Sequence, residues 1–264
     1  MSVKIVGAGW GGAQFVKKLA KYPIENAEYH AVEQKLVDYY LSKAAFENIH
    51  KVPEYLRKTL FSTIENSDQV LIFLEQNHQA IKLAEFCAEI LAEYSIKYLF
   101  IFINESPLLC HCQYQAVPKN TYYGKQPYIV LPKLSIEKYN TLICFIRDGV
   151  FSSGIGIDYA DFMSVMLGAN QIEIATAEVC FNSELPREEA LLAKVIPQLE
   201  PSILKQAKAM IFLLSSDGSL LLKEIEWIME KLICYFPDDA TIIFATQNDF
   251  NRTPFLALSV LIST

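Results

Sequence analysis

Along the first half of the chain, short runs of apolar residues alternate with segments whose apolar positions recur every three or four residues. The short runs predict buried strands over residues 3–6, 27–32, 70–74 and 98–103. The helically spaced positions predict one helix after residue 12 and further helices over 36–46, 53–64 and 80–93. Strands that alternate with helices are typical of a parallel sheet with helices on both faces, so we expect an α/β protein.

The pattern changes after residue 103. Prolines and polar residues predict an irregular connection over 104–132, and a helix over 136–147 is expected before a loop from Gly149 to Gly156. The remaining pattern predicts helices over 159–167, 187–199 and 220–235, and strands over 172–181, 209–214, 241–245 and 255–262. We therefore expect a Rossmann-like parallel-sheet domain of the nucleotide-binding type over 1–135, a connecting helix over 136–150 and a smaller α+β domain over 151–264.

Composition and charge exclude several classes of protein. Of the 264 residues, 52% are hydrophobic, which is enough to bury a large core without disulfide or metal staples. The 23 basic and 30 acidic residues give a net charge of −7, which argues against a nucleic-acid partner. No apolar run approaches the length of a membrane helix, and the six cysteines have no repeated spacing. We expect a cytoplasmic protein with free thiols.

The cluster Cys110-His111-Cys112 contains metal-ligand residue types, but the sequence has no second pair of ligands at the spacing that zinc sites use. None of the four histidines stands at the spacing of a nucleophile and its base. We therefore expect no metal site.

A glycine-rich turn follows the first predicted strand and opens the first predicted helix. Its sequence satisfies G-x-G-x-x-G, and the candidate cofactor-binding residues are Gly7, Gly9, Trp10, Gly11 and Gly12. Glycine lets the backbone approach a phosphate, and a helix start offers free N–H groups. A tight strand–helix turn would also need glycine for its geometry alone. Trp10 could stack on a base or block the pocket.

The same turn supports an alternative function. Glu33 stands at the end of the second predicted strand, where an acid would bind a ribose hydroxyl in a dinucleotide site. The turn and Glu33 together are therefore also consistent with a Rossmann-type protein that depends on NAD or FAD.

Residues Gly154–Met166 have the sequence G-I-G-I-D-Y-A-D-F-M-S-V-M and resemble a loop and helix of FtsZ with the pattern N-x-D-F-A-D-V-x-x-V-M. The closing segments 239–246 and 256–264 are similar to the last two strands of that family, and Lys4–Gly9 and Ala27–Val32 to its first two. The four similar pieces follow the family's order, so the sequence is identified as a divergent member of the FtsZ/tubulin superfamily.

The resemblance implies a role for two acids. In FtsZ the loop enters the nucleotide site of the next subunit, and its acids help to orient the attacking water. That role carries over to Asp158 and Asp161 as candidate catalytic residues, although the asparagine of the family is Gly156 here. The spacing of the two acids is also that of ordinary helix capping, which needs no partner subunit.

The departures from the family are equally informative. FtsZ has a second phosphate loop, G-G-G-T-G-T-G, where this sequence has Leu74–Gln79, and no glycine occurs between Gly12 and Gly124. Without glycine, a loop cannot easily wrap a phosphate, and Glu75 adds negative charge at the expected helix start. We expect weak or absent binding of GTP or GDP, no required cofactor and no GTPase activity.

The resemblance also implies self-association or an FtsZ-type protein partner, in a cell-division or cytoskeletal context. Members of the family stack head to tail. In FtsZ a flexible tail recruits membrane anchors, whereas this sequence stops at Thr264, at the end of the last expected strand. We therefore expect no direct membrane recruitment by a tail.

Overall fold

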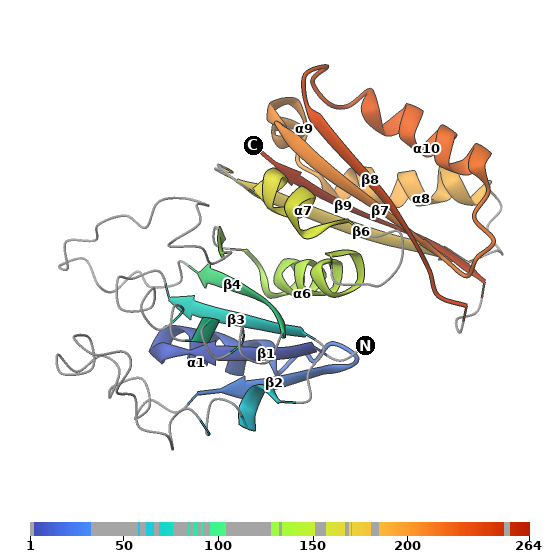
Figure 1. The fold of residues 1–264 in the computed structure, drawn as a ribbon. Coiled ribbons are helices and arrows are strands. Elements are labelled where there is room, and N and C mark those ends of the chain that lie inside the picture. Colours follow the sequence, from blue (N-terminus) through green and yellow to red (C-terminus); the bar gives the residue numbers. More distant parts are fainter. Residues whose placement is uncertain are drawn as a thin grey trace. The chain divides into compact units, whose positions relative to one another are not determined.

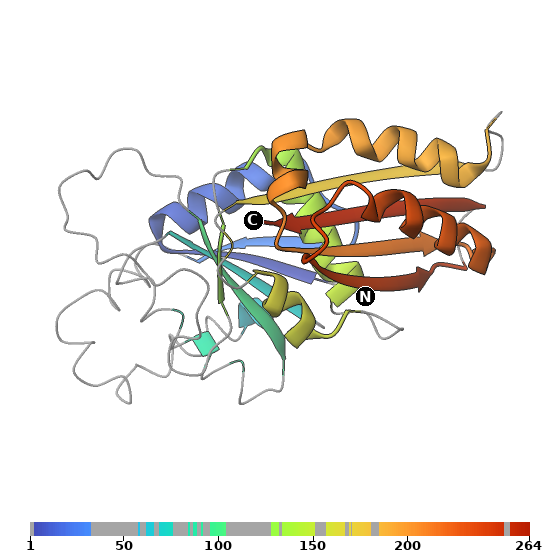
Figure 2. The same cartoon turned by 90° about the horizontal axis from the view of Figure 1, so that it is seen from above.

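The fold is seen in a computed structural model, which divides the chain into two compact units, Met1–Leu134 and Ser135–Thr264. The residues that the structure describes are 3–32, 58, 62–65, 69–75, 84, 87–88, 91, 96–103, 128–131, 134–150, 157–166, 169, 171–180, 185–250 and 254–264. Figures 1 and 2 show the units in two views. Among the described residues, no helix is long and apolar enough to cross a membrane.

The first unit contains a parallel sheet of five strands in the order β2-β1-β3-β4-β5, and Figure 1 labels the first four of these. The strands are β1 (Val3–Ala8), β2 (Ala27–Ala31), β3 (Gln69–Glu75), β4 (Lys97–Ile103) and β5 (Tyr128–Leu131). Every neighbouring pair in this sheet is parallel, which confirms the α/β prediction. The helix α1 (Gly9–Leu19) follows β1 directly.

Packing explains why these segments form the sheet and its covering helix. All six residues of β1 are buried, as expected of a strand that has neighbours on both sides. Phe15, Val16 and Leu19 stand at helical spacing on α1 and are fully buried. The ring of Phe15 lies 5.1 Å from that of Phe73 on β3, so α1 packs on β3 as well as on β1.

One prediction for the first unit is wrong in part, and others lie outside the described residues. The expected irregular connection over 104–132 ends in the strand β5, whose Ile129 and Leu131 are buried. Prolines on both sides, Pro127 and Pro132, concealed this short strand. The helix expected over 36–46 and most of those expected over 53–64 and 80–93 fall on residues that the structure does not describe.

The second unit contains a mixed sheet in the order β6-β9-β7-β8. Its strands are β6 (Ile172–Cys180), β7 (Ala209–Ser216), β8 (Thr241–Asn248) and β9 (Phe255–Ser263). β7 and β8 are parallel, and β9 is antiparallel to both β6 and β7. The helices are α6 (Ile136–Phe145), the π-helical turn η2 (Ile146–Val150), α7 (Tyr159–Met166), α8 (Arg187–Val195), the 3-10 turn η3 (Ile196–Gln198), α9 (Pro201–Gln206) and α10 (Leu222–Ile233).

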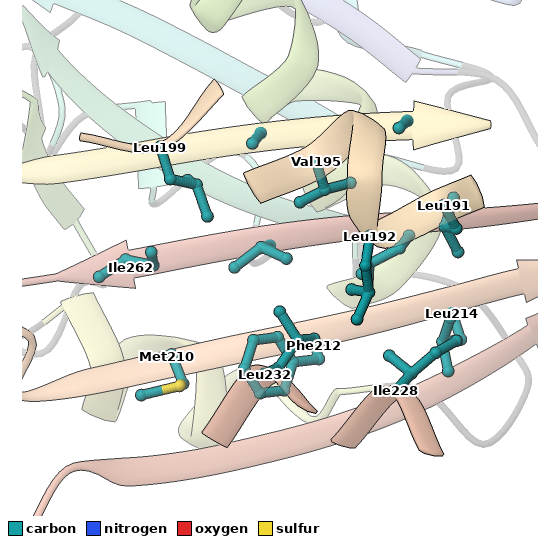
Figure 3. Close-up of a cluster of buried hydrophobic side chains, with 14 of the residues drawn as sticks. Leu191, Leu192, Val195, Leu199, Met210, Phe212, Leu214, Ile228, Leu232 and Ile262 are labelled. Atoms are coloured by element: carbon teal, nitrogen blue, oxygen red, sulfur yellow. The ribbon is translucent and has the colours of Figure 1, made fainter. Parts of the chain in front are cut away.

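The main core of the second unit lies between the sheet and helices α8, α9 and α10. Figure 3 shows Leu192 and Val195 of α8, with Ile228 and Leu232 of α10, over Phe212 and its neighbours on the strands. Every second side chain along each strand faces this layer, because successive side chains of a strand point to opposite faces of the sheet. On the other side of the sheet, α7 packs against β7 and β9.

The second unit differs from the sequence prediction at helix ends. The helix expected over 136–147 continues as η2 to Val150, so Gly149 lies in a helical turn and not in the expected loop. A Cβ on Gly149 would lie 3.1 Å from Leu213 Cδ2, so glycine suits this tight packing. The helix expected to end at 199 ends at Val195 and continues as η3, and α9 was not predicted. Pro201, at the first position of α9, is a residue that starts helices as readily as it ends them.

Candidate functional site

The glycine turn lies where β1 ends and α1 begins, as the sequence predicts. Gly9 has a φ of +77°, a conformation that favours glycine. A Cβ added to Gly9 would meet no heavy atom within 4 Å, so this position is open rather than packed. Strand, turn and helix therefore have the arrangement that phosphate sites with a G-x-G-x-x-G turn use.

Two other glycines of the turn are needed for packing. A Cβ on Gly7 would lie 2.3 Å from the carbonyl oxygen of Gly12, and one on Gly12 would lie 2.2 Å from the carbonyl oxygen of Phe73. Both distances are shorter than any real contact, so the backbone of α1 approaches β1 and β3 only because side chains are absent here. The tight-turn explanation therefore accounts for Gly7 and Gly12 without any ligand.

The electrostatics at the start of α1 suit an anion. Ala8, at the N-cap, gives no side-chain hydrogen bond, and the first turn contains no acidic residue. The first N–H groups of the helix therefore have no side-chain cap, and the positive end of the helix dipole is not neutralised. Gly11 and Trp10 belong to this first turn, but the side chain of Trp10 is outside the described residues.

The strand order places this turn at a switch point of the sheet. In the order 2-1-3-4-5, the chain moves to one side of β1 first and to the other side afterwards, and ligands of such sheets bind at the carboxyl ends of the two strands there. β1 ends at Ala8, whose register partner on β3 is Leu74. β3 ends at Glu75. Glu33 and residues 76–79, where the resemblance would place the second phosphate loop of FtsZ, lie outside the described residues.

The start of α7 contains the two candidate catalytic acids. The backbone N–H of Asp161 donates to Asp158 Oδ1 at 2.7 Å, and the N–H of Phe162 donates to the Asp158 carbonyl oxygen at 3.1 Å. Asp158 is therefore a side-chain N-cap of α7, and Asp161 lies in the first turn, where negative charge is favourable. Both residues are exposed. The geometry accounts for Asp158 as a cap, and catalysis by either acid stays a prediction.

A buried ion pair in the second unit was missed by the sequence analysis. Arg187, at the start of α8, forms a two-pronged ion pair with Glu224 on α10, and Arg187 Nη2 lies 2.6 Å from Glu224 Oε2. Arg187 also donates to the hydroxyl of Ser219 at 2.8 Å and to its carbonyl oxygen at 2.7 Å. The pair therefore fixes the segment that joins β7 to α10.

Glu224 also closes the start of α10. Its Oε2 accepts the backbone N–H of Leu221 at 2.8 Å. Burial would raise the pKa of Glu224, but the hydrogen bonds from Arg187 and Leu221 and the charge of Arg187 outweigh burial and lower it. The only sequence signal for this contact is an acid three residues after Leu221, because Arg187 lies 37 residues away from Glu224 in the chain.

The described residues contain no group of three or more His, Cys, Asp or Glu side chains that could hold a metal ion. The cluster Cys110-His111-Cys112 lies outside them. Cys87, which is described, is a free thiol, and burial raises its pKa to about 12. This thiol is therefore protonated at neutral pH and is a poor nucleophile.

No protein-family model matches the sequence, and no curated protein matches it. Solved structures do match. CetZ1 from Haloferax volcanii, a GDP-bound monomer, is 14% identical with a TM-score of 0.55, and the match covers 100% of this chain and 94% of that one. CetZ2 from the same organism, a GTPγS-bound protofilament, is 10% identical with a TM-score of 0.55, and the match covers 99% and 92%.

A mutant FtsZ from M. jannaschii is 16% identical with a TM-score of 0.51, and the match covers 100% of this chain and 91% of that one. At such identities the likeness concerns the fold alone. These matches do not favour the NAD- or FAD-dependent alternative that the glycine turn and Glu33 also allowed.

Proposed function

We propose that this chain, which has the fold of the FtsZ/tubulin superfamily, acts through contacts with its own copies or with an FtsZ-type protein partner, in a cytoskeletal or cell-division context. The matches to CetZ and FtsZ over nearly the full length of this chain support the proposal. One of those neighbours is a protofilament, which makes self-association the first property to test. A head-to-tail contact between identical subunits generates open filaments unless something stops it.

In this proposal, the nucleotide site is degenerate and the protein is not an active GTPase. The observation that carries this step is the stretch from Ala13 to Tyr123, which contains no glycine. A loop in this stretch cannot easily wrap the phosphates of a nucleotide, since positive φ and close backbone approach both favour glycine. The sequence also has an acid, Glu75, as the last residue of β3.

Any phosphate that does bind is expected on the amides of Gly9–Gly12. The open face of Gly9, the absent side-chain cap and the first turn without acids support this location. A single helix start gives few contacts, so affinity for GTP or GDP is expected to be weaker than micromolar. Isothermal titration with GTP, GDP, NAD and FAD tests the expectation, and micromolar or tighter GTP binding would overturn it.

Sedimentation tests assembly. The chain is centrifuged alone, with GTP, and with a functional FtsZ in the presence and absence of GTP. We expect the same pelleting of this chain with and without GTP, and a change in the pelleting of FtsZ. Strong GTP-dependent pelleting of this chain alone would contradict an inactive nucleotide site.

The variant Asp158→Asn separates capping from catalysis, because asparagine caps a helix as well as aspartate but has no charge. The proposal predicts unchanged stability and unchanged, background-level GTP hydrolysis for Asp158→Asn, and the same hydrolysis for Asp161→Asn. A hydrolysis rate well above background in the parent chain that either variant abolishes would restore the catalytic role of these acids.

A further inference from the structure

The two outer strands of the second sheet, β6 and β8, differ in how their free edges are protected. On β6, Lys194 Nζ donates to the carbonyl oxygen of Glu178 at 3.0 Å, and Gln198 Nε2 donates to that of Thr176 at 2.9 Å. These side chains come from α8 and η3. Edge carbonyls that are already bonded, together with the charge of Glu178, make β6 a poor template for another strand.

On β8, the hydrogen bonds to β7 show which backbone groups point outward. The N–H of Thr241 donates to the carbonyl of Lys208 at 2.9 Å, and the N–H of Asp249 donates to that of Ser216 at 2.7 Å. Because successive residues of a strand direct their backbone groups to opposite sides, the odd-numbered residues of β8 bond to β7. The residues of β8 whose N–H and C=O groups point away from β7 are therefore the even-numbered ones, Ile242, Phe244, Thr246 and Asn248.

Nothing among the described residues pairs with this outward side of β8. The strand has the sequence T-I-I-F-A-T-Q-N, without charge and without proline, and at eight residues it is about 26 Å long. Phe244 is 37% exposed and Ile243 is half-buried, so both faces of the sheet end in an incompletely covered apolar side chain. Natural edge strands usually contain lysine, proline or a bulge that prevents pairing, and β8 has neither residue.

Charges at the two ends of β8 oppose pairing with a second copy. Asp238 and Asp239 are exposed just before the strand, and Asp249 follows it. Self-pairing across a two-fold axis runs the two strands antiparallel, so it places Asp249 of one copy beside Asp239 of the other, at both ends of the pair. Like charges in those positions destabilise the pair, and the net charge of −7 adds to the repulsion.

We propose that the free edge of β8 binds an extended segment of a partner protein that has an uncharged, β-branched or apolar centre and a lysine or arginine at each end. The centre would bond to the outward groups of β8 and pack beside Phe244 and Ile243. The basic ends would meet Asp238 and Asp239 at one end and Asp249 at the other. The inference deepens the partner contacts of the proposed function, and it needs no nucleotide.

Synthetic peptides test the inference on the full chain. All have a centre of alternating valine and threonine: one has two lysines at each end, a second has glutamates in their place, and a third keeps the lysines but has prolines in the centre. Fluorescence anisotropy should show saturable binding of the first peptide, at least about tenfold tighter than that of either other peptide. Equal binding of the two lysine peptides, or no binding of the first, would overturn the inference.

Matched variants locate the site. Thr246→Pro removes one outward donor and leaves the bonds between β7 and β8, since proline is tolerated where an edge N–H faces solvent. Thr176→Pro is the control on the edge of β6. We expect Thr246→Pro to weaken binding of the first peptide about tenfold and Thr176→Pro to leave that binding unchanged. Equal effects of the two variants would contradict a site on β8.

A double variant, Asp238→Asn with Asp239→Asn, tests the role of charge. It should weaken binding of the first peptide about fivefold and leave binding of the proline-containing peptide unchanged. Unchanged binding of the lysine peptide would contradict the basic ends. Sedimentation equilibrium of the full chain completes the test. If the parent chain were a dimer and Thr246→Pro a monomer, the edge of β8 would bind a second copy of this chain and not a partner protein. None of these measurements uses GTP or FtsZ, so their failure is distinguishable from failure of the proposed function.

Discussion

The start of α1 in the first unit differs from the starts of α7 and α10 in the second unit. In the first unit, α1 follows β1 with no side-chain cap, no acid in its first turn and an open Gly9. In the second unit, a carboxylate closes the start of α7 through Asp158 and the start of α10 through Glu224. A helix start that is closed by its own carboxylate has little to offer an anion, whereas an uncapped one keeps its N–H groups for a ligand.

The difference shows that α1 and α10 are positioned by different means. α1 is positioned by close backbone approach at Gly7 and Gly12, and α10 by the buried pair of Arg187 and Glu224. Backbone packing leaves the end of the helix free, and side-chain capping occupies it. Of the two, only the first arrangement fixes the helix and leaves its first turn without a side-chain cap.

The largest effect is expected from Gly12→Val. Its Cβ would lie 2.2 Å from the carbonyl oxygen of Phe73, so α1 must move away from β3. We expect a loss of about 4 kcal/mol or more in the free energy of unfolding of the first unit. Urea unfolding measures it, with Gly9→Ala as the control that suffers only backbone strain, about 1 kcal/mol. Equal losses in the two variants would mean that backbone packing does not position α1.

The variant Glu224→Gln breaks the ion pair that positions α10 in the second unit. It keeps the size of the side chain but leaves Arg187 buried without its ion-pair partner. We expect a loss of about 3 kcal/mol in the free energy of unfolding of the second unit. Lys223→Gln, at an exposed neighbour, is the matched control and should change stability by less than about 0.5 kcal/mol. A similar loss in both variants would show that the ion pair does not position α10.

A smaller effect is expected from Asp158→Ala, which removes the cap of α7 but no buried group. The expected loss is about 1 kcal/mol in the free energy of unfolding, and Asp158→Asn should restore nearly all of it. Urea unfolding of the three proteins gives the ranking. If alanine and asparagine at this position were equally destabilising, the charge and not the cap would stabilise α7.

The smallest effect is expected on how the free energy of unfolding changes as the pH falls. The pKa of Glu224 is lower in the folded chain than its unfolded value of about 4.3, so its contribution is complete above that pH and is lost as the pH falls through the folded value. The parent chain should therefore lose more stability between pH 7 and 3 than Glu224→Gln does. Urea midpoints across this range measure the difference, and parallel curves would show that Glu224 is not linked to acid unfolding.

Local pattern was enough to predict most of the strands, because β1, β3 and β4 are apolar runs with a single buried interpretation. It also predicted the strand–turn–helix at Gly7–Gly12. It missed β5 because Pro127 and Pro132 stand on either side of this short apolar run and conceal the strand pattern. The ion pair of Arg187 and Glu224 was missed for a different reason, because only the folded chain brings together residues so far apart in the sequence.

The position of β9 has a consequence for how the second unit is made. β9 is the last strand of this unit along the chain, yet it lies in the sheet between β6 and β7. While a ribosome is still synthesising the chain before Phe255, β6 has no neighbour in this sheet, and β7 lacks one of its two. The sheet therefore closes only when β9 emerges, so a nascent chain that stops short of it exposes the apolar faces and edges that chaperones and proteases recognise.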